Sequence, residues 1–179
     1  MSEFYTLKVA GLTRQLEKFP VNEKMDIAAF IMFDDVELTE KCAEELLKRA
    51  PEFDVILTPE AKSIPLAYEM AKQAKKPYVV ARKGLKVYMR NPVCASVTSI
   101  TTKDPQKLYL GETEVNKISG KKVLVLDDVV STGESLDAAR KLVSAANGIE
   151  VAACAVLAEG DAADRDDIIY LERLPLFFK

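Results

Sequence analysis

A pair of adjacent acids followed by a hydroxyl-rich turn is the segment of this chain best suited to chemistry. Asp127 and Asp128 follow the apolar run 123–126, and two valines separate them from the turn Ser131-Thr132-Gly133-Glu134-Ser135. The turn leads into a helical pattern, and the N–H groups at a helix N-terminus bind phosphate. Because carboxylates repel phosphate, we expect the acids to accept hydrogen bonds from sugar hydroxyls or to hold a divalent cation. The segment therefore predicts a site for a sugar that carries a phosphate at one end.

Each of these features also has a purely structural interpretation when it is taken alone. A buried strand, acids that cap a turn and an ordinary helix N-cap explain them one by one. Their succession in this order favours a ligand site instead. Gly133 adds to that expectation, because glycine lets the backbone approach a ligand closely or adopt a positive φ.

The composition excludes several kinds of catalytic and binding site. The 179 residues include no histidine, which rules out Ser-His-Asp, Cys-His and histidine–zinc chemistry. The seven glycines are too widely spaced for a dinucleotide or Walker A loop, and the three cysteines too scattered for a metal knuckle. A net charge of -3 gives no basic surplus for nucleic acid. With no basic-apolar leader or membrane-spanning run, we expect a cytoplasmic protein that binds neither nucleic acid nor membrane.

Alternating helical and strand patterns predict the framework that must position the acids and the turn. Apolar residues recur at helical spacing over three segments, 39–50, 64–75 and 135–146. Continuous apolar runs typical of buried strands lie at 55–57, 78–81, 123–126 and 151–157. The segment 85–110 departs from this pattern, and its β-prone residues predict a hairpin or a mobile excursion rather than another strand–helix unit. The alternation favours one α/β domain over 1–179, with a parallel sheet flanked by helices and ligands bound beyond the carboxyl ends of its strands.

The segment Val123 to Ser135 resembles the phosphoribosyl-pyrophosphate signature of type I phosphoribosyltransferases, and specifically their purine branch. The resemblance implies the fold of that family, with a small N-terminal hood contributed by about residues 1–38. It implies that Asp127 and Asp128 contact the ribose and take part, directly or indirectly, in binding Mg²⁺. It also implies that the 5′-phosphate is bound by Val130, Ser131, Thr132, Gly133, Glu134 and Ser135.

Two further segments are similar to the pyrophosphate-binding parts of the same family. Glu60-Ala61-Lys62-Ser63-Ile64 stands where adenine phosphoribosyltransferases carry Glu-Ala-Arg-Gly-Phe, so that Lys62 keeps the charge of the arginine but loses its bidentate fork. Arg82, Lys83 and Lys86 match the basic cluster that opens the family's flexible loop. In relatives, such a cluster reaches the pyrophosphate across a dimer interface, and the resemblance therefore implies a homodimer.

The residues that would select the purine base depart from the adenine pattern. Adenine enzymes place a Tyr and a Glu where the ungapped register puts Ser99 and Thr102, and the stretch 95–101 is more similar to bacterial xanthine enzymes. Phe30 or Phe33 of the hood is expected to stack on the base, although either ring can equally be ordinary core. The acceptor of the base proton stays open between a pyrophosphate oxygen, Glu60 and Glu159.

The resemblance implies transfer of a phosphoribosyl group from phosphoribosyl pyrophosphate to a purine base, with adenine favoured and pyrophosphate released. Such a reaction relies on positioning and charge and needs no histidine, in agreement with the composition. Two alternatives remain open at this point: a xanthine-specific transferase, and a regulator that binds the same ligands without turnover. A phosphate-accepting receiver domain is disfavoured, because its acids belong on an early strand.

Overall fold

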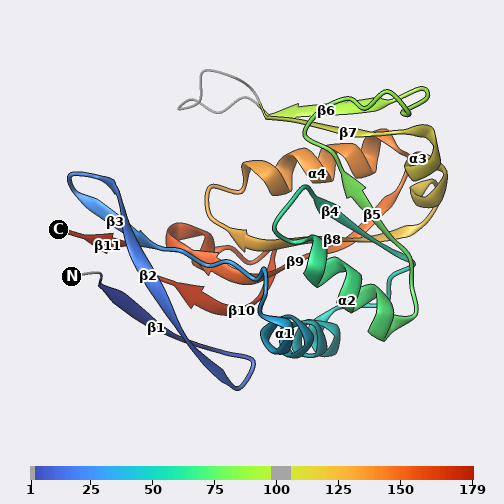
Figure 1. Cartoon of the computed structure of the whole chain (residues 1–179). Helices are drawn as coiled ribbons and strands as arrows, with labels where there is room; N and C mark the ends of the chain where they lie inside the picture. Colours follow the sequence, from blue (N-terminus) through green and yellow to red (C-terminus); the bar gives the residue numbers. More distant parts are fainter. Residues whose placement is uncertain (1–2, 98–105) are drawn as a thin grey trace.

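The computed structural model describes residues 3–97 and 106–179, and its centre is a parallel five-stranded sheet (Figure 1). The strand order is β10-β9-β8-β4-β5, and all neighbouring pairs are parallel. Every residue of β4 is buried, as expected for a strand covered on both faces. The strands are β4 (Val55–Pro59), β5 (Tyr78–Ala81), β8 (Lys122–Val130), β9 (Ile149–Glu159) and β10 (Ile169–Leu174). The α/β fold class predicted from the sequence is thereby confirmed.

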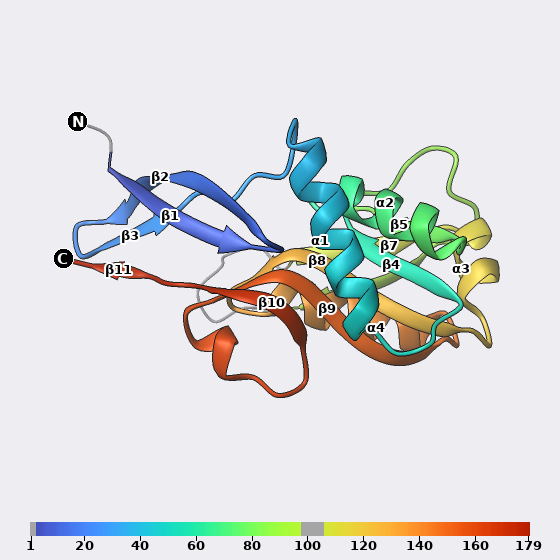
Figure 2. The same ribbon diagram turned by 90° about the horizontal axis from the view of Figure 1, so that it is seen from below.

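Helices cover both faces of this sheet (Figures 1 and 2). Helices α1 (Val36–Arg49) and α2 (Ile64–Ala74) bury their apolar sides in one core cluster, and α4 (Glu134–Ala145) buries its own in the cluster on the other face. Helix α1 begins earlier than the predicted residue 39, because the side chain of Asp35 caps it by accepting a hydrogen bond from the Leu38 N–H.

A second, four-stranded sheet stands at the end of the molecule where both chain termini lie (Figure 2). Its order is β1-β2-β3-β11, with antiparallel pairing throughout. The strands are β1 (Phe4–Val9), β2 (Leu12–Asn22), β3 (Met25–Ala28) and β11 (Phe177–Phe178). The N-terminal segment therefore forms a meander that the last residues of the described chain complete.

The remaining described elements lie in the connections that follow strands β5 and β9 of the central sheet. Strands β6 (Val93–Val97) and β7 (Gln106–Leu110) pair antiparallel, which confirms the predicted hairpin for its described residues, and they lie over α4 (Figure 1). Residues 98–105, which include Ser99 and Thr102, lie outside the described residues. Helix α3 (Glu112–Ile118) and the short 3₁₀ helix η1 (Gly160–Asp164) complete the fold. No helix in the described ranges has the length and apolar character needed to cross a membrane.

Two strand predictions need correction. Strand β8 does not end at residue 126, because Val129 and Val130 still pair with Leu157 and Ala158 of β9. The two acids therefore lie within the last part of the strand rather than after it. In addition, the four predicted strands are joined by a fifth, β10, which adds an edge beyond β9.

Candidate active site

The acid pair of β8 lies buried near the carboxyl end of the central sheet. Asp127 and Asp128 are 8% and 3% exposed, and the Asp128 N–H donates a 2.9 Å hydrogen bond to Asp127 Oδ1. Burial, followed by the charge of the neighbouring Asp128, raises the pKa of Asp127 well above its ordinary value. A bound cation or a ring of hydroxyl donors would lower the cost of charging this group.

The loop between β4 and α2 brings a cation directly to this pair. Lys62 Nζ lies 3.0 Å from Asp128 Oδ2, an oxygen that accepts no hydrogen bond of good geometry within the described structure. The loop is held by a buried chain of hydroxyls, in which Thr58 donates to Ser63 at 2.7 Å and Ser63 donates to the Pro59 carbonyl at 3.2 Å. The Glu60–Ala61 peptide bond in this loop is cis. The structure thus unites Lys62 with the acids, two elements that the sequence separates widely.

The second basic segment contacts the same loop through Glu60. Arg82 Nη2 lies 3.3 Å from Glu60 Oε1, and the Lys83 N–H donates a 3.0 Å hydrogen bond to Glu60 Oε2. The backbone of Arg82 is fixed by two hydrogen bonds to Tyr109 of β7. Lys83 is exposed, and the side chain of Lys86 makes no ion pair with the described residues. The predicted pyrophosphate-binding residues therefore form one connected group, with the exception of Lys86.

The turn between β8 and α4 has the backbone shape expected of an anion-binding loop. Gly133 adopts a φ of +84° and is the N-cap of α4, so the N–H groups of the first helical turn face the loop. Ser131 and Thr132 are exposed, Glu134 and Ser135 are half-buried, and Val130 is buried beneath them. The small hollow of about 40 Å³ at this point is lined by Asp127 and by residues 129–136.

Arg165, which was not among the predicted site residues, covers the same turn. A Cβ atom on Gly133 would overlap Nη1 of Arg165, which comes from the segment after η1. Arg165 is held by Asp167, to which Nε and Nη2 donate at 2.8 Å and 2.7 Å. The spacing of Arg165 and Asp167 did not mark the arginine as a ligand-binding residue, because it is also typical of an ordinary surface ion pair.

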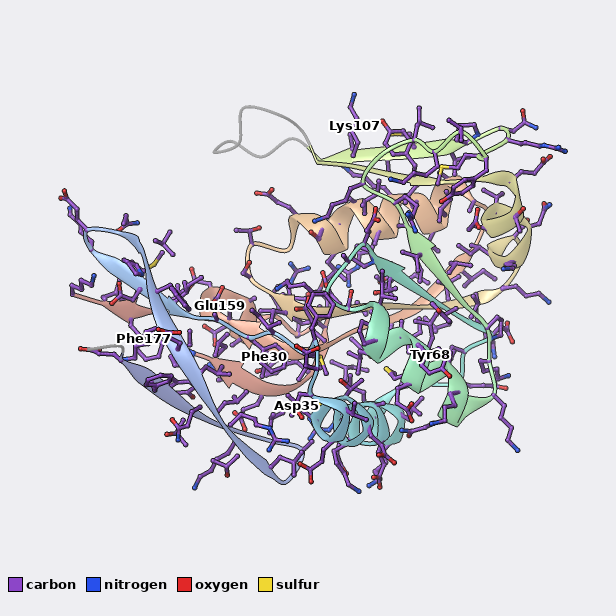
Figure 3. All side chains as sticks on the ribbon, in the orientation of Figure 1. Phe30, Asp35, Tyr68, Lys107, Glu159 and Phe177 are labelled. Carbon is purple, nitrogen blue, oxygen red and sulfur yellow. The ribbon has the colours of Figure 1, made fainter. Side chains whose placement is uncertain are left out.

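Glu159 and the two phenylalanines occupy three different surroundings. Glu159 ends β9 where the central sheet meets the N-terminal sheet (Figure 3), and burial raises its pKa while the charge of Lys62 opposes the shift. Phe30 is 4% exposed and belongs to the core cluster beneath α1. Phe33 is 45% exposed and faces a separate hollow. Neither ring lines the hollow beside Asp127.

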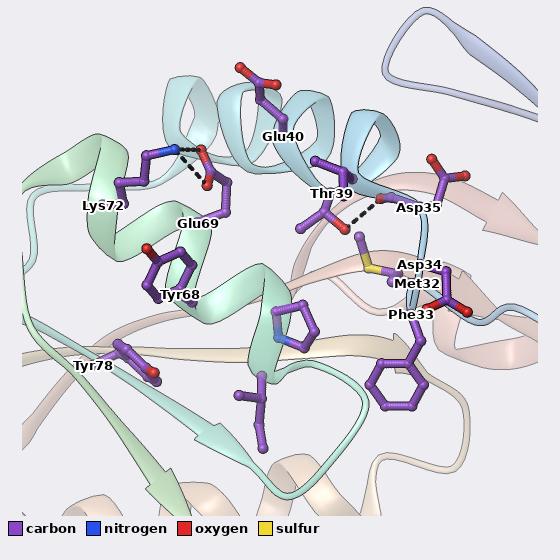
Figure 4. A pocket seen from close by; sticks show the side chains of 13 residues that line it. Met32, Phe33, Asp34, Asp35, Thr39, Glu40, Tyr68, Glu69, Lys72 and Tyr78 are labelled. Carbon is purple, nitrogen blue, oxygen red and sulfur yellow. Dashed lines mark hydrogen bonds and ion pairs between the residues drawn. The ribbon is translucent and has the colours of Figure 1, made fainter.

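That separate hollow lies between the start of α1 and helix α2 (Figure 4). Its volume is about 670 Å³, and the rings of Phe33, Tyr68 and Tyr78 form much of its wall. Asp34, Asp35, Glu40 and Glu69 give it an acidic rim that Lys72 offsets in part. The rim is therefore unsuited to a phosphate or pyrophosphate group.

The acids of β8 fit a magnesium ion that is shared with a ligand. No cluster of three or more side chains of the metal-binding types occurs in the described part of the chain. Mg²⁺ is commonly held by one or two carboxylates together with water and substrate phosphates. Asp128 Oδ2, which is buried and pairs with the Lys62 ammonium, meets that requirement.

Comparisons with known proteins agree with this geometry. The family model of the phosphoribosyl transferase domain matches residues 36–174. The chain is 31% identical over 113 residues to the purine biosynthesis transcriptional repressor PurR of Bacillus subtilis, covering 63% of this chain and 39% of that protein. It is 34% identical over 136 residues to the hypoxanthine/guanine phosphoribosyltransferase of Methanothermobacter thermautotrophicus, covering 70% and 65%. The chain thus spans less than two thirds of the length of these curated relatives.

The fold is also that of a solved adenine phosphoribosyltransferase. The structure of the enzyme from Thermoanaerobacter pseudethanolicus matches with a TM-score of 0.73 at 21% identity, over 88% of this chain and 95% of that one. The family model covers both the loop that carries Lys62 and the whole segment from the acids to α4. The chain therefore belongs to the phosphoribosyl transferase domain family, in its purine branch.

Proposed function

We propose that the protein transfers a phosphoribosyl group from phosphoribosyl pyrophosphate to a purine base, with adenine favoured, and releases pyrophosphate. The observation that carries this proposal is the convergence of three elements: the buried acid pair, the phosphate-type turn and Lys62, which pairs with Asp128 at 3.0 Å. A cation beside buried carboxylates and next to a helix N-terminus suits a ligand with a hydroxyl-bearing sugar between two anionic ends.

In this proposal each part of the ligand has its own set of residues. Asp127 and Asp128 accept hydrogen bonds from the ribose hydroxyls, and the turn 131–135 with Val130 beneath it binds the 5′-phosphate. Glu60 orients Arg82 and Lys83, and the Ala61 backbone with Lys62 and Lys86 completes the pyrophosphate site. Mg²⁺, when bound, supplies positive charge to the leaving pyrophosphate.

The reaction breaks the bond between C1 of the ribose and the pyrophosphate oxygen and forms a bond from C1 to a purine nitrogen. The ribose becomes cationic in the transition state, and the buried acid pair stabilises that charge. Of the two carboxylates considered for the proton of the base, Glu60 is engaged by Arg82 and Lys83. Glu159 is the better acceptor, because burial raises its pKa towards the range of a general base.

Adenine is favoured over other purines for two reasons. The segment Asp-Asp-Val-Val-Ser-Thr-Gly is that of the adenine pattern, and the Glu159 carboxylate can accept a hydrogen bond from an exocyclic amino group but repels a keto oxygen. The meander and β11 supply the hood, and Phe33 or Phe30 stacks on the base. The burial of Phe30 makes Phe33 the stronger candidate, provided that its ring turns away from the hollow of Figure 4.

We propose that the protein acts as a cytoplasmic homodimer. Leu85, Val87 and Tyr88 are exposed apolar residues on the basic loop after β5, and the hollow lined by Tyr68 and Tyr78 is aromatic and acidic (Figure 4). These surfaces are complementary in charge and apolar character. Light scattering is expected to give twice the monomer mass, and Val87→Asp is expected to shift the mass to that of a monomer; a monomeric wild type would contradict the proposal.

The test of the function is incubation with phosphoribosyl pyrophosphate, Mg²⁺ and each of adenine, hypoxanthine, guanine and xanthine. We expect adenine to give its mononucleotide and pyrophosphate in equal amounts. Asp128→Asn is expected to abolish turnover while the far-ultraviolet circular dichroism stays unchanged. Turnover of xanthine alone would contradict the preference for adenine and support the xanthine-specific transferase.

The similarity to a repressor favours a second candidate, a regulator that binds phosphoribosyl pyrophosphate or a nucleotide without turnover. PurR, as its name states, represses transcription, and this chain spans only 39% of it. Binding of phosphoribosyl pyrophosphate by calorimetry, together with no product from any of the four bases, would establish the regulator and contradict the transferase.

A further inference from the structure

We infer that Arg165 recognises the 5′-phosphate and, by its charge, makes the turn 131–135 a phosphate site. The inference rests on the proposed function, which already places that phosphate on the turn. It adds a residue that follows η1, far from the turn in the sequence and outside the predicted phosphate-binding segment. The contact that suggests it is the close approach of Arg165 Nη1 to Gly133.

The arginine is held in place by a chain of ion pairs. Its Nε and Nη2 donate to the two oxygens of Asp167, in the bidentate arrangement that fixes a guanidinium plane. Asp167 is held in turn by Arg140 of α4, whose Nη1 donates at 2.5 Å to Oδ2 and whose Nη2 donates at 2.9 Å to the backbone carbonyl. With two nitrogens engaged, Nη1 is the remaining donor, and it faces Gly133 without a hydrogen-bond partner among the described residues.

The charges of the helix start explain why a cation is needed there. The first turn of α4 carries Glu134 and Asp137, two carboxylates that oppose a phosphate dianion at the same place. Arg165 lies 4.0 Å from Asp137 Oδ1 and partly offsets that charge. A guanidinium is also a strong partner for phosphate, because it presents parallel N–H donors. The glycine at position 133 leaves room for this approach, since a side chain there would occupy the space of Nη1.

A purely structural role for Arg165 makes a different prediction. If the arginine served only to hold Asp167 and the turn, its loss would also weaken ribose 5-phosphate, and Arg165→Lys, which lacks the bidentate fork, would weaken it as much as Arg165→Gln does. If it recognises phosphate by its charge, its loss weakens ligands that carry a 5′-phosphate and leaves pyrophosphate binding beside Lys62 unchanged, and lysine restores part of the affinity. The partial rescue by Arg165→Lys therefore separates the roles, independently of turnover.

The experiment is isothermal titration of ribose 5-phosphate, and separately of pyrophosphate with Mg²⁺, into wild type, Arg165→Gln and Arg165→Lys. Arg173→Gln is the matched control, because Arg173 makes an exposed ion pair with Asp164 at 3.1 Å close by in the chain. We expect Arg165→Gln to weaken ribose 5-phosphate about 10- to 100-fold, Arg165→Lys to weaken it less, and the control to leave it unchanged. Pyrophosphate affinity should stay within about twofold of wild type in all variants.

Equal ribose 5-phosphate affinity in wild type and Arg165→Gln would overturn the inference, as would a parallel loss of both ligands. A wild-type protein that binds neither ligand would instead overturn the proposed function. A thermal melt of each variant confirms that the comparison is made between folded proteins.

Discussion

The pair of Lys62 and Asp128 gives a quantitative prediction for the ligand-free protein. Replacement of Lys62 by Met removes the cation that pairs with Asp128, a carboxylate whose side chain is 4% exposed. A buried polar group left without its partner costs about 1–3 kcal/mol. Because Lys62 itself is 51% exposed, water takes up part of its place, and we expect a loss of about 1–2 kcal/mol.

Urea unfolding at pH 7, followed by circular dichroism, measures this loss. For a chain of this size it corresponds to a decrease in Tm of about 2–8 °C. Lys62→Arg keeps the charge and should lose less. Lys72→Met is the matched control, since Lys72 pairs on the surface with Glu69 at 3.2 Å. Equal urea midpoints for the Lys62→Met and Lys72→Met proteins would refute the reasoning. It would also be refuted if Lys62→Met cost as much stability in an Asp128→Asn background as in the wild type.

Three further predictions concern neighbouring parts of the site and the contact between β2 and the start of α1. Burial raises the pKa of Asp127 to about 8, so the folded state holds a proton that the unfolded chain releases near pH 4. The free energy of unfolding should therefore decrease as the pH rises from about 4 to about 8, by up to about 1.4 kcal/mol per pH unit. Unfolding of Asp127→Asn from pH 5 to 8 should show a flatter profile than wild type, and parallel profiles would count against a buried, protonated Asp127. Gly133→Ala should lower stability by about 1 kcal/mol or more and abolish ribose 5-phosphate binding, because φ at this position is +84° and Arg165 occupies the place of the added methyl group. Normal ribose 5-phosphate binding by calorimetry would contradict this prediction. Arg14→Met should destabilise the protein by about 1 kcal/mol at pH 7, since Arg14 pairs with Asp35 at 2.6 Å and with Glu37 at 2.8 Å. Because the Arg14 guanidinium also lowers the pKa of Asp35, the difference in stability from wild type should shrink as the pH falls below about 4. A difference that stays constant during acid unfolding would argue against this.

The local patterns predicted the buried elements of the central sheet well. Strand β5 spans the residues expected, and α2 and α4 lie within one residue of the predicted bounds. The apolar periodicity of these segments indicates their secondary structure whichever element packs against them. Strand β8 was predicted too short because its buried acids interrupt the apolar run. Its extension through Val130 is stabilised by pairing with β9, which local sequence does not encode.

Elements that depend on distant partners were missed for the same reason. Strand β10 lies at the sheet edge, and its mixed sequence Ile-Tyr-Leu-Glu-Arg-Leu has no clear period. Strand β11 has two residues and exists only because Phe177 and Phe178 pair with β3. The acids and the turn of the site were found because they are contiguous. The approach of Arg165 to Gly133 joins segments that only the folded chain brings together.

We propose that a sugar phosphate binds where the buried acids of β8 meet the first turn of α4. A crystal structure with ribose 5-phosphate and Mg²⁺ would show whether it does. We expect the phosphate on the N–H groups of residues 131–135 and the ribose hydroxyls within hydrogen-bond distance of Asp127 and Asp128, with Lys62 displaced from Asp128. Clear density for the ligand at another place, with Lys62 still paired to Asp128, would contradict the account.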